Sequence, residues 1–280
     1  MRLSDKVVVI TGGGSGLGRE CALLFSAEGA KVVVTDLSSK RSEKVASEVI
    51  DAGGEAVWMK ADVRVEEEMN AAVDLAVSTY GRLDIMFANA GIGEVGFGTV
   101  AFDELTLENW QAVQDTNLTG VFLTSKAAFR AMKKQEYGTI VVTTSAASLV
   151  AYPGFVSYTA SKHGANGLVK ALSFDLGKYG IRINALCPTH GMSANLPLPL
   201  EAEVLGKSYE EVTGPWVKDH AAMPLRLNRP PNLRDNANVA LFLASDESAY
   251  MSGVCLPATD GGTHARVAIN FPDTPGVLPK

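Results

Sequence analysis

The chain has 280 residues, of which 46% are hydrophobic and 20% are charged. This length suits one large α/β domain or two small ones, and the composition is that of a globular protein with a sizeable core. The formal net charge of −6 argues against nucleic acid and anionic membranes as partners, because both are bound by basic surfaces.

The start of the chain does not follow the pattern of a signal peptide, because Asp5 and Lys6 lead directly into a short apolar run and a glycine loop. No apolar run approaches the roughly 18 residues that suggest a membrane helix. We therefore expect a cytoplasmic protein that makes no membrane contact. Cys21, Cys187 and Cys255 are widely spaced and are expected to be buried free thiols. The scattered histidines lack the spacing of metal ligands, so no metal is expected.

Short apolar runs alternate with amphipathic helical stretches along the chain. Most of the runs show little polar alternation and are rich in valine and isoleucine, which is typical of strands buried on both faces of a parallel sheet. Strand–helix alternation predicts right-handed crossovers and one doubly wound α/β domain, with a seven-stranded parallel sheet and helices on both faces. The predicted strands are residues 7–10, 32–34, 56–59, 83–88, 139–142, 181–186 and 254–258.

The first predicted strand ends in a glycine loop, and a helix follows at once. Glycines let the backbone approach a pyrophosphate closely, and the N–H groups at a helix N-terminus bind anions. A plain glycine-rich turn is the alternative, and the strand–helix context favours a dinucleotide site. The loop runs from Thr11 to Gly18, and its predicted cofactor contacts are Gly12, Ser15, Gly16, Leu17 and Gly18.

The second predicted strand leads to Asp36, about 20 residues beyond the glycine loop. A carboxylate at this place accepts hydrogen bonds from the adenosine ribose and repels a 2′-phosphate, so NAD is predicted over NADP. A helix cap or a turn aspartate is the alternative. Arg19, Lys40 and Arg41 lie nearby in the sequence and leave some use of NADP open. Leu37, which follows the carboxylate, is also expected to contact the cofactor.

Tyr158 and Lys162 are four positions apart, so their side chains share one face of a helix. A free tyrosine has a pKa of about 10 and is a poor base at neutral pH. A nearby ammonium in a partly dry site stabilises the phenolate and lowers that pKa. The pair alone is common by chance, and an exposed helix pair is the alternative.

Several motifs in register give a specific resemblance. They occur in the order and spacing of the short-chain dehydrogenases/reductases, over about residues 3–262. The chain resembles this family, which implies a Rossmann-type fold, a nicotinamide cofactor and a homotetramer. The motifs are the glycine loop, Asp62-Val63, Asn89-Ala90-Gly91, Asn117, Ser145 and Tyr158-x-x-x-Lys162.

The resemblance implies a role for each catalytic residue. Tyr158 is expected to be the acid/base, Lys162 to lower its pKa and hold the nicotinamide ribose, and Ser145 to polarise the substrate oxygen. Asn117 is expected to hold a water that links Lys162 to solvent. Taken singly, Ser145 would be an ordinary strand-end serine, and Asn117 would be a helix cap or a satisfied buried amide.

The remaining motifs are expected to line the cofactor site. Asp62 and Val63 are expected to contact the adenine, although Asp62 alone would be a turn residue. Asn89, Ala90 and Gly91 are expected beside the cofactor, and Asn89 is also expected to brace the central strands.

The chain departs from the family pattern after the sixth predicted strand. The family has Pro-Gly, a branched apolar residue and threonine there, and these groups bind the nicotinamide carboxamide. The chain instead has Thr189 for the glycine, Gly191 for the branched residue and Ser193 for the threonine. Pro188, Gly191 and Ser193 are still expected to contact the cofactor. His190 is expected to be a structural loop residue.

We assign residues 1–262 to a dinucleotide-binding and catalytic domain and residues 263–280 to a C-terminal tail. Residues 193–231 form an apolar insertion, which by resemblance covers the substrate site as a lid; packing of a short helix pair is the alternative. The predicted reaction is hydride transfer between nicotinamide C4 and a secondary alcohol or ketone on an alicyclic, aromatic or steroid-like skeleton. A lyase or dehalogenase on the same scaffold, and an NAD-binding sensor without turnover, are the competing functions.

Overall fold

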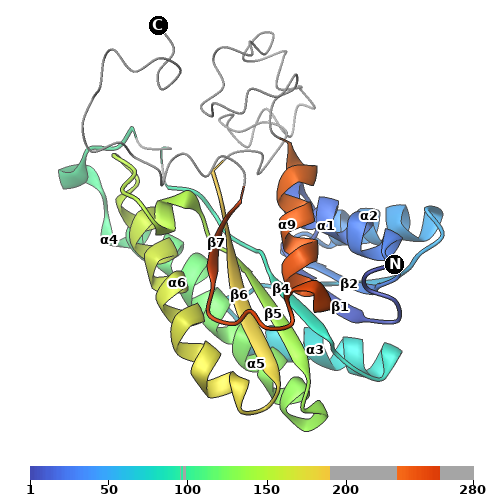
Figure 1. Ribbon diagram of the computed structural model, residues 1–280. Coiled ribbons are helices and arrows are strands. Elements are labelled where there is room, and N and C mark those ends of the chain that lie inside the picture. Colours follow the sequence, from blue (N-terminus) through green and yellow to red (C-terminus); the bar gives the residue numbers. More distant parts are fainter. Residues whose placement is uncertain (95, 97–98, 190–231, 259–280) are drawn as a thin grey trace, which may run out of the picture.

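The computed structural model describes residues 1–94, 96, 99–189 and 232–258. Its strands are β1 (Val7–Thr11), β2 (Lys31–Asp36), β3 (Glu55–Lys60), β4 (Ile85–Ala88), β5 (Gly138–Thr143), β6 (Ile181–Pro188) and β7 (Cys255–Ala258). They form one seven-stranded sheet in the order β3-β2-β1-β4-β5-β6-β7, and every neighbouring pair is parallel (Figure 1). All seven strands predicted from the sequence are confirmed.

Helices cover both faces of this sheet (Figure 1). One face carries α1 (Gly16–Ala27), α2 (Ser39–Asp51) and α9 (Leu233–Ala244), and the other carries α3 (Glu66–Tyr80), α5 (Gly120–Gln135) and α6 (Val156–Gly177). Side chains alternate along β1 between the two resulting cores. Val8 and Ile10 pack with the first set of helices, and Val7 and Val9 pack with the second. The predicted doubly wound α/β fold is therefore confirmed.

The order of the strands gives the sheet a topological switch point at its centre. The chain moves outward from β1 to β3 and then returns to β4 on the other side of β1. Ligands of open parallel sheets bind at such a switch point, beyond the carboxyl ends of the strands. The loops that follow β1, β4 and β5 all meet at this edge, and they contain the motifs that the sequence singled out.

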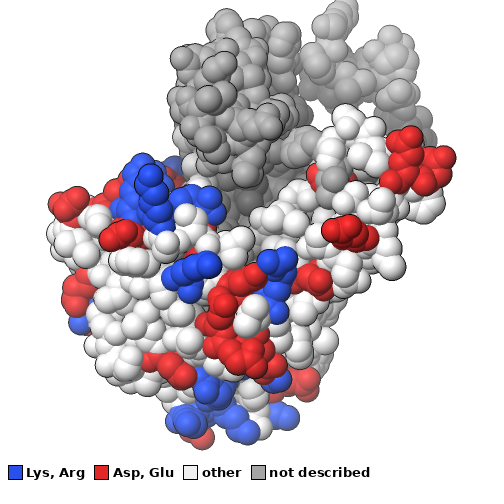
Figure 2. Space-filling model, turned by 180° about the vertical axis from the view of Figure 1, so that it is seen from behind, with Lys and Arg blue, Asp and Glu red and all other residues white. Residues whose placement is uncertain are grey.

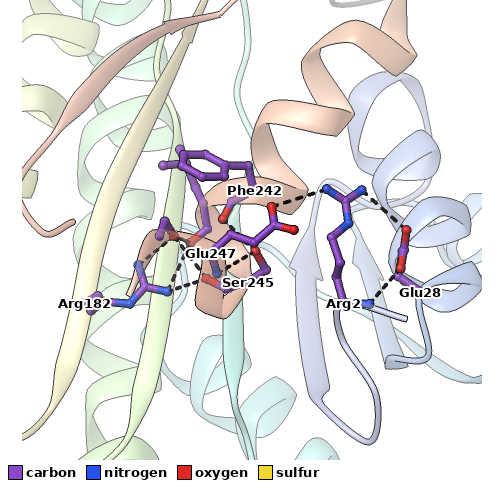
Figure 3. A network of polar contacts seen from close by, with 8 residues as sticks. Arg2, Glu28, Arg182, Phe242, Ser245 and Glu247 are labelled. Carbon is purple, nitrogen blue, oxygen red and sulfur yellow. Dashed lines mark hydrogen bonds and ion pairs between the residues drawn. The ribbon is translucent and has the colours of Figure 1, made fainter. Parts of the chain in front are cut away.

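An arginine of β6 fixes the end of α9. The Arg182 guanidinium donates hydrogen bonds to the carbonyls of Leu243 and Ser245 at 3.4 and 3.1 Å. The last carbonyls of a helix have no partner within the helix and carry partial negative charge, so a cation satisfies them well. Figure 3 shows this cluster beside the more exposed ion pair of Arg2 and Glu28. The loop that leads into β7 is thereby attached to the sheet.

The surface charges, the helices and the cysteines give no sign of a nucleic-acid site, a membrane span or a disulfide among the described residues. Acidic and basic side chains are interspersed over the face seen in Figure 2, and no continuous basic surface covers it. None of the helices in the described ranges has the length and apolarity that a membrane crossing requires. All three cysteines are free: Cys21 and Cys187 are buried as predicted, whereas Cys255 is only partly buried.

Candidate active site

The glycine loop between β1 and α1 has the backbone that an anion site needs. Gly12 and Gly16 have φ angles of 61° and 51°, which are left-handed and favour glycine. A Cβ at Gly18 would lie 2.1 Å from the carbonyl oxygen of Gly12, so only glycine fits there. Ser15 is the N-cap of α1 and makes no side-chain cap hydrogen bond. The first N–H groups of α1 lack intrahelical partners, and this arrangement fits a pyrophosphate.

Asp36 lies at the end of β2, next to this loop, and is almost fully buried. One oxygen accepts a hydrogen bond from the Gly14 amide at 3.2 Å, and the other accepts from the Ser38 amide at 2.9 Å. Asp36 thus makes the turn contact that the sequence left as an alternative. It also pairs at 2.6 Å with Arg41, one of the basic residues that lie nearby in the sequence. Leu37, the next residue, is exposed at the same edge.

Asn89 joins three central strands at their carboxyl ends. Its Nδ2 donates to the carbonyls of Thr11 and Gly12 at 3.2 and 3.3 Å, and its Oδ1 accepts from the hydroxyl of Thr143 at 3.0 Å. The side chain therefore braces the loops after β1 and β4 against β5. A Cβ at Gly12 would lie 2.9 Å from the Cα of Ala90, so the two loops are in close contact.

Ser145, Tyr158 and Lys162 come together beyond β5. Ser145 precedes the short 3₁₀ turn η4 (Ala146–Ser148), and its hydroxyl accepts a hydrogen bond from the Ala147 amide at 3.1 Å. Tyr158 lies in the first turn of α6, and the Ser145 hydroxyl is close enough to lower the pKa of its phenol. Lys162 lies one turn further, and its Nζ is 5.5 Å from the centre of the Tyr158 ring. The predicted acid/base, lysine and serine are therefore neighbours in space.

Burial dominates the ionisation of this group. Desolvation raises the pKa of Tyr158 above its ordinary value of 10.0, while the hydrogen bond with Ser145 lowers it and nearby Tyr152 raises it. Desolvation also lowers the pKa of Lys162 to about 8. The lowered pKa that the sequence predicted for Tyr158 is thus not what the structure of the chain shows. The reason is desolvation of the buried phenol, which is the largest influence on its pKa. Lys162 Nζ instead donates a hydrogen bond to the Thr143 carbonyl at 3.1 Å.

Asn117 is fully buried and lies in a π-helical turn, η3 (Asp115–Thr119), that follows α4 (Leu107–Gln114) and precedes α5. Its amide pairs with the main chain of Ile92: Oδ1 accepts at 2.8 Å and Nδ2 donates at 2.9 Å. Asn117 is thus the satisfied buried amide that the sequence left as an alternative. A Cβ at Gly91 would lie 3.1 Å from Asn117 Oδ1 and 3.3 Å from Lys162 Nζ. Asn117, Gly91 and Lys162 therefore converge, and π-turns are frequent at functional sites.

Asp62 and Val63 follow β3 at the same edge of the sheet. The Arg64 guanidinium pairs with Asp62 at 2.6 Å and holds the pKa of that carboxyl below its usual value. Val63 is buried beneath Gly120, where an added Cβ would lie 2.7 Å from it. Both residues lie on the β3 side of the glycine loop, which is where an adenine would extend.

Sequence reasoning missed two residues that support the catalytic group. Asn166 lies one turn after Lys162 on α6, and its Nδ2 donates to the hydroxyl of Ser148 at 2.7 Å. Ser148 in turn donates to the carbonyl of Ser145. Glu94 accepts a hydrogen bond from the main-chain amide of Tyr158 at 2.8 Å. The signals were weak: Asn166 is one helical turn from Lys162, and Glu94 is one acid in the loop after a predicted strand.

Aromatic rings extend from the predicted acid/base. The rings of Phe155 and Tyr158 are 6.3 Å apart, as are those of Tyr152 and Phe155. Pro188 ends β6 at the same edge of the sheet. Gly191, Ser193 and the insertion at 193–231 lie outside the described residues. Within the described part of the chain, no group of three His, Cys, Asp or Glu residues could hold a metal ion.

Known proteins share this sequence and this architecture. A family profile described as short chain dehydrogenase matches residues 6–195. A cyclohexanol dehydrogenase from Acinetobacter sp. (strain SE19) is 38% identical over 254 residues, covering 90% of this chain and 92% of that protein. A secoisolariciresinol dehydrogenase from Forsythia intermedia is 39% identical over 265 residues, covering 93% of this chain and 90% of that protein.

Solved structures agree with the sequence matches. Levodione reductase superposes with a TM-score of 0.81 at 33% identity, covering 95% of this chain and 100% of that chain. A 7α-hydroxysteroid dehydrogenase in complex with NADH and 7-oxo glycochenodeoxycholic acid superposes with a TM-score of 0.79 at 31% identity, covering 93% of this chain and 95% of that chain. The chain therefore belongs to the short-chain dehydrogenase family of oxidoreductases.

Proposed function

We propose that the chain is an NAD(H)-dependent oxidoreductase that interconverts a secondary alcohol and a ketone by direct hydride transfer. One observation carries this proposal. The Ser145 hydroxyl lies close enough to the Tyr158 phenol to influence its pKa, with Lys162 one turn away, beside a glycine loop that fits a dinucleotide. A protein that only senses NAD has no use for an acid/base at this place.

The residues at the carboxyl edge of the sheet fit a nicotinamide cofactor. The glycine loop, with Gly12, Ser15, Gly16, Leu17 and Gly18, would hold the pyrophosphate. Asp36 and Leu37 would hold the adenosine ribose, and Asp62 and Val63 the adenine. The nicotinamide end would lie near Asn89, Ala90, Gly91, Lys162 and Pro188, and we keep Gly191 and Ser193 as further contacts. When bound, the cofactor accepts or supplies the hydride at nicotinamide C4.

The chain's own residues handle the proton. In oxidation Tyr158 takes the proton of the alcohol hydroxyl, and in reduction it donates that proton to the carbonyl oxygen. The hydroxyl of Ser145 donates a hydrogen bond to the same substrate oxygen and polarises it. Lys162 orients the ribose, and Asn117 would hold the water that connects Lys162 to solvent. Because burial raises the pKa of Tyr158, alcohol oxidation is expected to accelerate toward alkaline pH, and ketone reduction to proceed at neutral pH.

The substrate is proposed to be hydrophobic, with an alicyclic, aromatic or steroid-like skeleton. The aromatic rings of Tyr152 and Phe155 beside Tyr158 support this class. Two relatives are named for ring compounds of this kind, a cyclohexanol dehydrogenase and a 7α-hydroxysteroid dehydrogenase. Residues 1–262 would act as one dinucleotide-binding and catalytic domain, with 193–231 covering the substrate and 263–280 as a tail.

We further propose a cytoplasmic homo-oligomer, with a tetramer favoured by family membership. Phe122 on α5 and Phe174 on α6 are exposed large apolar side chains on the same side of the sheet. A hollow between these two helices is lined in part by Phe122, Phe129, Leu172 and Tyr179. Contact with a second copy would remove this apolar surface from water.

The test is an assay of NADH formation over a panel of secondary alcohols that contains cyclohexanol, a phenyl-substituted alcohol and a hydroxysteroid, with NAD and NADP in parallel. We expect turnover with NAD, and a loss of about 100-fold or more in Tyr158→Phe. The fully exposed Tyr250 provides the matched control, Tyr250→Phe, which should keep wild-type turnover. NADH binding with no turnover across the panel would contradict the proposal and favour the sensor.

A further inference from the structure

The helix that bears Tyr158 begins without a cap of its own. Its N-cap, Phe155, makes no side-chain cap hydrogen bond, and its first turn contains no acidic residue. By contrast, α2, α4 and α9 are each capped by a side chain of their own N-cap residue, Ser38, Thr106 and Asn232. The first N–H groups of any helix need partners outside the helix, and Tyr158 carries one of them.

Glu94 supplies that partner from a different part of the chain. Its Oε2 accepts the hydrogen bond from the Tyr158 amide at 2.8 Å, across 64 residues of sequence. The Glu94 side chain is buried, with 6% of the residue exposed. Its other oxygen, Oε1, is also buried and has no hydrogen-bond partner among the described residues. A carboxylate interacts favourably with the positive end of the helix dipole.

A buried carboxylate is an expensive way to cap a helix. A half-satisfied buried acid loses hydration that a serine or threonine N-cap would not lose, and such an N-cap would serve stability equally well. The presence of Glu94 is therefore better explained by its contact with Tyr158 than by helix stability alone. The N–H that it binds belongs to Tyr158 itself and to no other residue of the turn.

The loop that carries Glu94 is also attached to the rest of the catalytic group. Ile92, two residues earlier, is paired through its main chain with Asn117 at 2.8 and 2.9 Å. Gly91 lies against Lys162, since a Cβ there would be 3.3 Å from Nζ. The loop thus contacts the surroundings of the lysine and of the tyrosine at two separate points. A shift of this loop would move the first turn of α6 with it.

We propose that Glu94 is a positioning residue for Tyr158. Its carboxylate, through the main-chain amide of Tyr158, fixes the first turn of α6 against the loop after β4 and thereby keeps the phenol beside Ser145. Glu94 acts through the backbone and does not itself touch the substrate. The inference rests on the proposed function, because it takes Tyr158 as the acid/base. Small misplacements of a reacting group cost about 100-fold in rate for about 1 Å, so the effect should appear in kcat.

Three substitutions of Glu94 separate the effect of its hydrogen bond on kcat from the effects of its charge and its side-chain size. Glu94→Gln keeps an oxygen that can accept from the amide and should retain kcat within about 3-fold. Glu94→Ala removes the acceptor, and Glu94→Asp withdraws it by one methylene; both should lower kcat by about 10-fold or more. The KM for NAD should stay within about 2-fold in all three, because the glycine loop is untouched. The probes are NAD and cyclohexanol.

Asn232→Ala is the matched control for the loss of a helix cap. Asn232 caps α9, on the opposite face of the sheet, by accepting from the Asp235 amide at 3.2 Å. This variant should lower the melting temperature and leave kcat at the wild-type value. Wild-type kcat in Glu94→Ala, or an equal loss in Glu94→Gln and Glu94→Ala, would overturn the proposal. If Glu94→Ala does not fold, Glu94→Asp and Glu94→Gln are compared instead. A loss of kcat in Glu94→Asp but not in Glu94→Gln supports the proposal, and equal kcat values in the two variants overturn it.

A second measurement does not depend on turnover. Hydrogen exchange of the Tyr158 amide should be slow in the wild-type chain and in Glu94→Gln, and faster by about 10-fold or more in Glu94→Ala. Unchanged exchange in Glu94→Ala would overturn the contact itself. If the wild-type chain oxidises no alcohol while exchange responds as expected, the proposed function and the catalytic part of this inference fail, and the contact stands.

Discussion

Lys162 Nζ donates a 3.1 Å hydrogen bond to the carbonyl of Thr143, so the last residue of β5 holds a buried ammonium of α6. Only 3% of Lys162 is exposed, and desolvation lowers its pKa from 10.5 to about 8. Folding therefore disfavours the protonated form of Lys162, which is the form that the proposed mechanism uses. A lysine at this place costs stability in exchange for function, as is common at active sites.

Lys162→Met should raise the free energy of unfolding at pH 7 by about 2 kcal/mol and abolish turnover. The lowered pKa corresponds to a cost of about 3 kcal/mol, from which the lost hydrogen bond to Thr143 subtracts about 1 kcal/mol. Between the folded pKa of about 8 and the ordinary value of 10.5, the folded wild-type chain has released a proton that the unfolded chain still binds. Wild-type stability therefore rises with pH over this window, and the advantage of the variant shrinks.

Urea unfolding at pH 7 and near pH 10 measures this difference. Lys170→Met is the control, because Lys170 is exposed on the same helix and its removal leaves the buried Lys162 in place. A Lys162→Met variant that is less stable than wild type at pH 7 would show that the hydrogen bond outweighs the desolvation.

Asp36→Asn should shift cofactor preference from NAD toward NADP. The substitution removes the charge that repels a 2′-phosphate and frees Arg41, which pairs with Asp36 at 2.6 Å. We expect kcat/KM to fall about 10-fold with NAD and to rise about 10-fold with NADP, since a charge-assisted hydrogen bond is worth about 1.5–3 kcal/mol. Adding Arg41→Ala to the variant should cancel the gain with NADP. An unchanged ratio would leave Asp36 as a turn residue only.

Gly18→Ala should abolish NADH binding, as measured by the fluorescence of bound NADH. Its Cβ would lie 2.1 Å from the Gly12 carbonyl, so the glycine loop must move. Gly167→Ala is the matched control, because Gly167 is also in a helix and an added Cβ there meets no atom within 4 Å. That variant should bind NADH normally and gain up to about 1 kcal/mol of stability. Normal binding by Gly18→Ala would place the pyrophosphate elsewhere.

The fold was predictable because its strands are buried on both faces. The run of residues 7–10 is apolar throughout and buried, which is the pattern of a central parallel strand. The edge strand β3 is exposed or half-buried along its whole length, and it was still predicted from its short apolar run at 56–59. Predicted boundaries were off by one or two residues, as at β4, where the run began at 83 and the strand begins at Ile85.

The supporting contacts were not predictable in the same way. Tyr158 and Lys162 could be paired from their spacing on one helix, which is a local relation. The contact of Glu94 with Tyr158 joins residues 64 positions apart and depends on how the loop after β4 lies against α6. The pKa of Tyr158 was predicted in the wrong direction, because a sequence does not show how dry a site is. Desolvation is a property of the packed whole.

Arg182→Met should destabilise the fold without altering the catalytic group. Arg182 donates to the carbonyls of Leu243, Ser245 and Met251, and its removal leaves these acceptors without their charged partner. We expect the free energy of unfolding to fall by about 2–4 kcal/mol. Arg2→Met is the control: Arg2 pairs with Glu28 and Glu247 on the surface, where an ion pair contributes about 0–1 kcal/mol.

Both variants should retain wild-type kcat well below their melting temperatures, because Arg182 lies on β6 away from the carboxyl edge where the catalytic group meets. Urea unfolding and the alcohol assay on the same preparations separate the two effects. Equal losses of stability in the two arginine variants would mean that the cluster at the end of α9 behaves as a surface ion pair. A loss of kcat in Arg182→Met alone would instead mean that the attachment of α9 and β7 reaches the active site through the sheet.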